Sequence, residues 1–110
     1  MTKVAEPPYV YLTTTGRRSG QPREIEIWFT QREGRYYVIA ETGPRAQWVR
    51  NLQVNSRVHW RVAEVSFSGQ ARVIDAAAEP GLNEAVQALS REKYGWGEGL
   101  VVELIPDTAA

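Results

Sequence analysis

The sequence predicts a mainly β protein, a six-stranded closed or split β-barrel with two short helices, as one domain over residues 1–110. Three observations support this prediction. Apolar residues alternate with polar residues in several short segments, as they do in strands with one buried face. Turns that contain glycine or proline separate many of these segments. Two other stretches show the helical spacing of apolar residues. A barrel is favoured because closure hides the edges of the sheet.

The predicted strands are either β-branched and aromatic or strictly alternating, which are the compositions that pleated structure favours. They cover residues 9–15, 25–29, 36–41, 57–62, 67–74 and 100–104. The apolar members of four of these segments are expected to form the barrel core: Ile25, Ile27, Phe29, Val38, Val58, Trp60, Val62 and Val73.

Two helices are expected between the strands. The first begins around Thr42, which can cap it, with Pro44 in the first turn, where its missing N–H is not needed. Trp48 and Leu52 share its apolar face. The second helix opens at Pro80. The predicted order of elements is therefore β-β-β-α-β-β-α-β.

The composition excludes several classes of site. Cysteine is absent and histidine occurs once, at His59, so thiolate and histidine-rich metal sites are excluded and no metal is expected. Lysine plus arginine and aspartate plus glutamate number 13 each, which disfavours nucleic acid as a partner, including a single strand stacked on Trp28 and Trp60. No apolar run approaches the ~20 residues of a membrane span, and the N-terminus lacks a signal-peptide core, so a cytoplasmic protein is expected.

The loop after the first strand is the strongest candidate site. Gly16 and Gly20 let the backbone turn sharply, and the residues between them offer planar cations and a hydroxyl, which together suit a phosphate. The residues expected to bind an anion are Arg17, Arg18, Ser19 and Gly20. The alternative is a solvated turn whose arginines pair with Glu24 or Glu26.

Two further segments are candidates for the same ligand. Thr42 and Gly43 lie at the predicted helix start, where free N–H groups favour an anion, and Arg45 adds a cation. The alternative is that the Gly-Pro pair only marks a chain turn and that Arg45 is a solvated surface residue. Tyr94 and Trp96 lie beside glycines and either cover a flat ring or close one end of the barrel.

Two motifs resemble one known family. Residues 12–23, from Leu12 to Arg23, resemble the opening motif of the deazaflavin-dependent nitroreductases, which use coenzyme F-420. Residues 48–55, followed by Val58, resemble that family's tryptophan-asparagine helix and next strand. The resemblance covers about residues 9–73 and implies a split β-barrel of the FMN-binding flavin-reductase type. One departure is Glu41, which stands where that family's pattern has a lysine-containing loop.

The resemblance also implies an activity. Reduced coenzyme F-420 would pass hydride to a quinone, a nitro compound or an activated alkene, so a small electron acceptor is the expected partner and no catalytic side chain is needed. The arginine-serine loop and the first helix, including Trp48, would hold the cofactor, and Tyr94 and Trp96 would lie near the substrate. FMN or haem as the ligand, a non-catalytic carrier, and either a monomer or a homodimer remain open.

Overall fold

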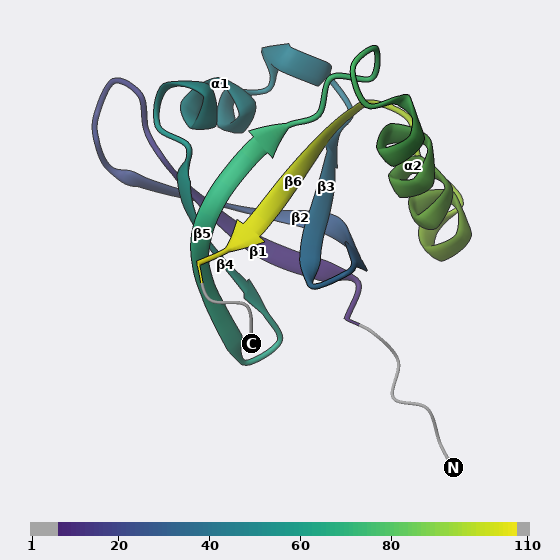
Figure 1. Ribbon diagram of the computed structural model, residues 1–110. Helices are drawn as coiled ribbons and strands as arrows, with labels where there is room; N and C mark the ends of the chain where they lie inside the picture. Colours follow the sequence, from purple (N-terminus) through teal and green to yellow (C-terminus); the bar gives the residue numbers. More distant parts are fainter. Residues whose placement is uncertain (1–6, 108–110) are drawn as a thin grey trace.

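Six antiparallel strands close into a barrel in the computed structural model, which describes residues 7–107 (Figure 1). The order around the barrel is β1-β2-β3-β6-β5-β4, and β4 pairs with β1 to close it. The predicted fold class and order of elements are confirmed. The strands are β1 Tyr9–Thr15, β2 Pro22–Arg32, β3 Arg35–Ala40, β4 Arg57–Val62, β5 Val65–Val73 and β6 Leu100–Pro106.

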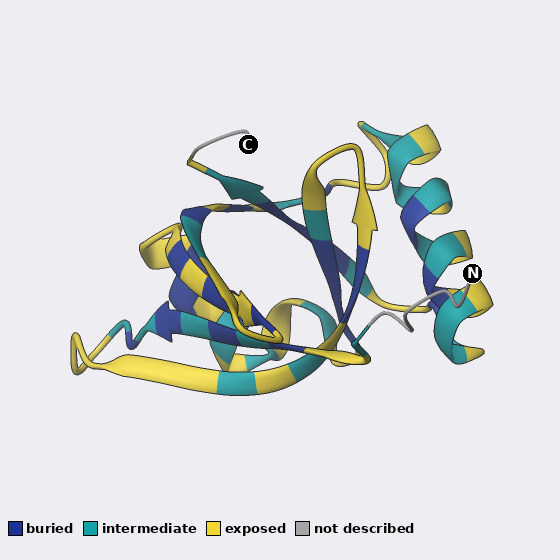
Figure 2. Cartoon of the chain, turned by 90° about the horizontal axis from the view of Figure 1, so that it is seen from below, coloured by how far each residue is buried: buried dark blue, intermediate teal, exposed yellow. Residues whose placement is uncertain are grey.

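Two α-helices pack on different parts of the barrel (Figure 1). Helix α1, Gln47–Val54, sends Leu52 into the main core and so covers one end. Helix α2, Pro80–Tyr94, lies along the outside, where Val86 packs against a second apolar cluster. Figure 2 shows that the buried residues of α2 face the strands. No helix in the described part of the chain is long and apolar enough to cross a membrane.

The expected start of the first helix is wrong. Gly43–Arg45 form a separate 3-10 turn, η1, and α1 begins only at Gln47. The two are separated because Ala46 has an extended conformation, with ψ of 136°. Thr42 precedes η1 but makes no capping hydrogen bond with its side chain. The proline that indicated the first turn of the helix is equally suited to the 3-10 turn that is present.

Five of the eight expected core residues are buried: Phe29, Val38, Val58, Trp60 and Val62. The prediction that Ile25, Ile27 and Val73 belong to the same buried core is only partly correct, because these three are half-buried and pack against it. Strand β2 pairs with β3 only from Phe29 onward, so its first half has no neighbouring strand on that side. Ile25 and Ile27 therefore line an opening rather than a closed interior.

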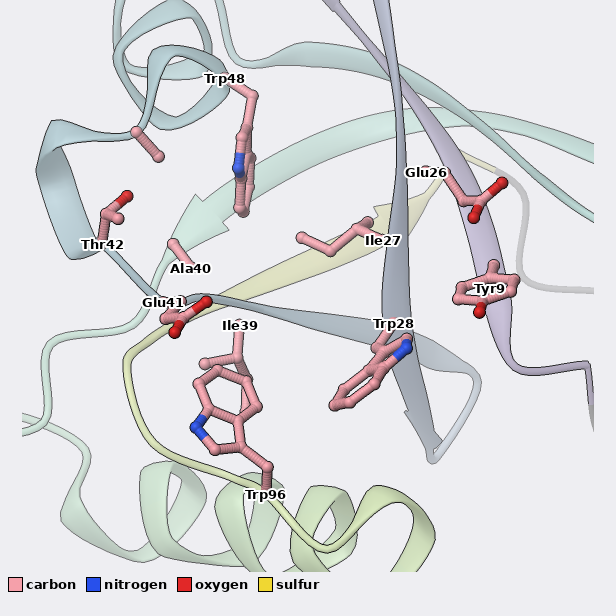
Figure 3. A pocket seen from close by; sticks show the side chains of 11 residues that line it. Tyr9, Glu26, Ile27, Trp28, Ile39, Ala40, Glu41, Thr42, Trp48 and Trp96 are labelled. Carbon is pink, nitrogen blue, oxygen red and sulfur yellow. The ribbon is translucent and has the colours of Figure 1, made fainter.

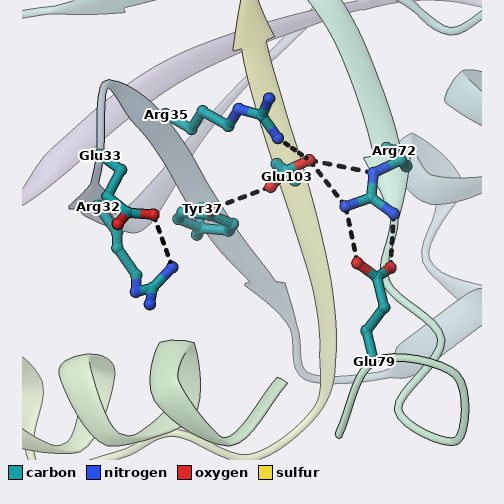
Figure 4. Close-up of polar contacts among 7 residues, drawn as sticks. All are labelled: Arg32, Glu33, Arg35, Tyr37, Arg72, Glu79 and Glu103. Carbon is teal, nitrogen blue, oxygen red and sulfur yellow. Dashed lines mark hydrogen bonds and ion pairs between the residues drawn. The ribbon is translucent and has the colours of Figure 1, made fainter. Parts of the chain in front are cut away.

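A buried carboxylate holds three strands together on the outside of the barrel (Figure 4). Glu103 on β6 is 1% exposed and accepts hydrogen bonds from Tyr37 at 2.8 Å, Arg72 at 3.0 Å and Arg35 at 3.2 Å. Arg72 also pairs with Glu79. Burial alone would raise the pKa of Glu103, but these three donors hold it below its ordinary value. Burial, followed by the bond to Glu103, raises the pKa of Tyr37 to about 12.

Candidate functional site

The wall of the barrel is open between the first half of β2 and β3. Residues 22–28 of β2 pair with β1, and β3 joins β2 only at Phe29, so the barrel wall is split along this half. Trp48 from α1 lies at the split. Two hollows adjoin there, and Trp48 lines both of them. Each has a volume typical of small-molecule sites, which range from about 300 to 1,000 Å³.

The first hollow, here called the basic hollow, has a volume of about 590 Å³. It lies between the β1–β2 loop and the first turns of α1, and it contains most of the predicted anion loop. Most of its lining residues are polar, and they include three arginines against one glutamate: Gly16, Arg17, Arg18, Ser19, Pro22, Arg23, Glu24, Ile25, Gln47, Trp48 and Asn51.

Arg17 is held in the basic hollow by two neutral amides of α1. Its Nη1 donates to Asn51 Oδ1 at 2.9 Å, and its Nη2 donates to Gln47 Oε1 at 2.8 Å. The backbone N–H of Arg17 also donates to Asn51 Oδ1, at 3.2 Å. Asn51 is only 5% exposed and is itself oriented by a bond from its Nδ2 to Thr14 Oγ1. The amides fix the guanidinium without neutralising its charge.

The charge in this hollow is not compensated by ion pairs. Within residues 7–107, no carboxylate forms an ion pair with Arg17, Arg18 or Arg23, so the expected pairing of these arginines with Glu24 or Glu26 is absent. Burial lowers the pKa of Arg17, and the neighbouring positive charges of Arg50 and Arg18 lower it further. A fixed cation with other uncompensated cations beside it is suited to binding an anion.

The loop itself is closed tightly by backbone hydrogen bonds. Gly16 N–H donates to Gln21 O, and Gly20 N–H donates to Gly16 O, both at 2.8 Å. Gly20 has a φ of +72°, which favours glycine. A Cβ on Gly16 would lie 2.6 Å from Ser19 Oγ, so this side chain packs directly over the glycine. The short loop therefore presents its arginines on a compact backbone.

The second hollow, here called the aromatic hollow, has a volume of about 610 Å³. Figure 3 shows Trp28, Trp48 and Trp96 projecting toward one space from β2, α1 and the segment after α2. Its lining combines aromatic and aliphatic side chains with two carboxylates and contains no lysine or arginine: Tyr9, Glu26, Ile27, Trp28, Ile39, Ala40, Glu41, Thr42, Ala46, Trp48 and Trp96.

Trp28 is supported from behind by Tyr94. The two rings are stacked with centroids 4.5 Å apart and planes 3° from parallel, and Trp96 contacts Trp28 edge-on at 6.2 Å. The Tyr94 hydroxyl accepts a hydrogen bond from Phe29 N–H at 3.0 Å and lies 2.6 Å from Phe29 O. Tyr94 therefore supports the wall of the aromatic hollow without lining it.

The structure divides the sequence-predicted site residues between the two hollows. Arg17, Arg18 and Ser19 line the basic hollow, with Gly20 at the tip of the same loop, and Trp48 lines both hollows. Thr42 and Trp96 line the aromatic hollow. Gly43 and Arg45 line neither, because they lie in the separate turn η1. The structure does not bring these two residues to the arginine loop.

Sequence reasoning assigned no site role to Gln47 or Asn51, and it considered Trp28 only as a stacking surface for nucleic acid. Gln47 and Asn51 are four residues apart on one helix, a spacing that places both side chains on the same face. Trp28 stands on the polar side of an alternating strand, where a large aromatic residue is unusual. Both patterns are visible in the sequence, but neither indicates which distant residues these side chains contact in the folded protein.

His59 lies outside both hollows. It is exposed on β4, and its Nδ1 is 2.7 Å from Ser68 Oγ on β5. In the described range, no group of three or more histidine and acidic residues is arranged to hold a metal ion.

Solved structures with the same fold confirm the split-barrel architecture. The F420-H2 dependent reductase FDR-A has a TM-score of 0.74 at 21% identity, over 94% of this chain and 99% of that one. A conserved hypothetical protein from Mycobacterium tuberculosis has a TM-score of 0.75 at 19% identity, over 91% and 73%. The haem storage protein HutZ from Vibrio cholerae has a TM-score of 0.75 at 21% identity, over 94% and 84%.

A family model matches most of the sequence. Residues 2–97 match the family described as F420H(2)-dependent quinone reductase. The chain therefore belongs to this family, and the predicted relationship to the enzymes that use coenzyme F-420 is confirmed.

Proposed function

We propose that this member of the quinone reductase family is an oxidoreductase that binds reduced coenzyme F-420 and reduces a quinone, a nitro compound or an activated alkene. The observation that carries the proposal is the uncompensated Arg17, fixed by Asn51 and Gln47 in a hollow that adjoins an aromatic one. The cofactor combines a phosphate and an acidic tail with a flat tricycle. Two adjoining hollows, one basic and one aromatic, fit that combination.

The basic hollow would hold the phosphate and the acidic tail. Arg17, Arg18 and Arg23 supply cationic donors, and Ser19 supplies a hydroxyl, all from one short loop. The first turn of α1 adds backbone N–H groups that have no partner within the helix. Because Arg17 is already ordered, little side-chain entropy is lost when an anion binds.

The aromatic hollow would hold the ring and the electron acceptor. Trp28, Trp48 and Trp96 supply flat apolar surfaces, and the unpaired edge of β2 supplies backbone donors and acceptors. When bound, the reduced cofactor supplies a hydride, which carries two electrons to the acceptor. The role of the protein residues is to orient the two rings and to exclude water. For a quinone, a proton from solvent completes the hydroquinone.

FMN and haem are the alternative ligands. FMN also has a tricycle and a phosphate, so it fits the same two hollows, but it lacks the acidic tail that the extra arginines would bind. One protein of the same fold, HutZ, is a haem storage protein. A histidine-ligated haem is disfavoured in the aromatic hollow, because no histidine lines it and His59 lies elsewhere. Family membership favours coenzyme F-420 over both.

The test is a titration of the purified protein with coenzyme F-420, FMN and haem, followed by tryptophan fluorescence. The variant R17A/R18A should bind coenzyme F-420 roughly 30- to 700-fold more weakly if both arginines make charge-assisted bonds. The matched control is R32A/R91A, which removes the same charge from sites outside both hollows. Unchanged affinity in R17A/R18A, or tighter binding of FMN than of coenzyme F-420 at low salt, would contradict the proposal.

A further inference from the structure

The two adjoining hollows carry opposite charges. The basic hollow is lined by three arginines and one glutamate, and the aromatic hollow by two glutamates and no cation. The net charge of the whole chain is zero, so this separation is a property of the site and not of the composition. A ligand that enters the aromatic hollow meets a negative field, whereas the adjoining hollow attracts anions.

Glu41 and Glu26 are the source of that negative field. Glu41 follows the last residue of β3, is exposed, and projects toward the space between Trp48 and Trp96 in Figure 3. Glu26 lies on the β2 side of the hollow, and its carboxylate raises the pKa of the nearby Tyr11 hydroxyl. Neither carboxylate forms an ion pair with a described cation.

The tryptophans act in the same direction as the carboxylates. The face of an indole ring is electron-rich and attracts a cation placed over it. Trp28, Trp48 and Trp96 all line this hollow, and Trp28 is held in place by its stack on Tyr94. A planar cation would therefore gain from both the ring faces and the glutamates. A planar anion would be repelled by both.

We propose that the aromatic hollow selects planar electron acceptors by charge: it favours cationic and neutral acceptors over anionic ones, and Glu41 and Glu26 determine this selection. That the bound compound is an electron acceptor rests on the proposed function. The selection itself is a binding property of the chain. It deepens the proposed function by naming the substrate class, which is neutral or cationic planar compounds rather than acids.

The first arm of the test needs no cofactor. Three naphthoquinones of similar size are titrated against the protein, one bearing a trimethylammonium group, one uncharged and one bearing a sulfonate, and tryptophan quenching is measured. The expected order of affinity is cation, then neutral, then anion. The variant E26Q/E41Q should raise the ratio of anion to cation affinity by about two- to fivefold per carboxylate and per unit of ligand charge, less at high salt.

The second arm repeats the series as turnover with reduced coenzyme F-420. The quantity compared is the ratio of kcat/KM between wild type and E26Q/E41Q for each quinone, so the different redox potentials of the quinones cancel. The control E64Q/E92Q removes two exposed carboxylates that line neither hollow. Thermal unfolding of each variant shows that the fold is retained.

The outcomes separate the two proposals. If the protein shows no turnover but still binds the quinones in the order cation, neutral, anion, the proposed function fails and the selection by charge stands. If turnover occurs but the affinity does not depend on the charge of the quinone, the selection by charge is overturned and the proposed function stands. An affinity ratio that is the same in E26Q/E41Q and in E64Q/E92Q also overturns it, because the field then does not come from these two carboxylates.

Discussion

Replacement of Asn51 by alanine tests the link between α1 and the arginine loop. Asn51 Oδ1 accepts hydrogen bonds from the backbone N–H and Nη1 of Arg17, and its Nδ2 donates to Thr14. The variant Asn51→Ala removes all three bonds while Arg17 keeps its bond to Gln47. The cation therefore stays in the loop but loses the partner that fixes its position.

Two magnitudes follow from these contacts. Each hydrogen bond of the buried Asn51 contributes roughly 0.5–1.5 kcal/mol, so the free energy of unfolding should fall by about 2–4 kcal/mol. The affinity for coenzyme F-420 should fall by about two- to tenfold, because Arg17 must then be ordered when the anion binds. In Asn51→Asp the acceptor remains but a negative charge is added, so anion binding should weaken more than it does in Asn51→Ala.

The assay combines urea unfolding with calorimetric titration of coenzyme F-420 and of its ring fragment without the phosphate. The control is Gln53→Ala, an exposed position on the same helix. Asn51→Ala should weaken binding of the whole cofactor and leave the fragment's affinity within about twofold, since Arg17 is assigned to the phosphate. Equal losses for both ligands would refute the reasoning.

Three further outcomes are expected. The raised pKa of Tyr37 means that its protonated hydroxyl stabilises the folded state fully below about pH 10, and this stabilisation is lost as the pH rises toward 12. Over that range, urea unfolding should show a fall of about 3 kcal/mol in the free energy of unfolding, and Tyr37→Phe should lack this fall. The pKa of Glu103 is lowered, so its stabilisation is present above about pH 4.3 and is lost at lower pH, and Glu103→Gln should be less sensitive to acid than wild type. Gly69→Ala should destabilise the barrel by about 1–3 kcal/mol or more, because its Cβ would lie 2.0 Å from Ile105 O, whereas the control Gly81→Ala has open space; equal melting temperatures would contradict this.

Local patterns predicted most of the elements. Strand β1 was expected over its observed bounds, and the helix that opens at Pro80 begins there. These predictions succeed because alternation and helical spacing are local signals that need no knowledge of neighbours. Strand β2 is longer than its alternating part, since its ladder with β1 extends back to Pro22 through polar residues. The start of α1 was misplaced, because Pro44 suits a 3-10 turn as well as an α-helical one.

By itself, the sequence determined the barrel class, the order of elements and the cationic glycine-flanked loop, since each depends on residues close together in the chain. Only the tertiary structure decided that β2 leaves β3 before Phe29, which opens the barrel and leaves Ile25 and Ile27 half-buried. It also decided that Asn51, 34 residues from Arg17, would orient that cation, and that acidic and basic side chains would be separated into two hollows. Barrel closure creates these neighbours, and no local periodicity encodes them.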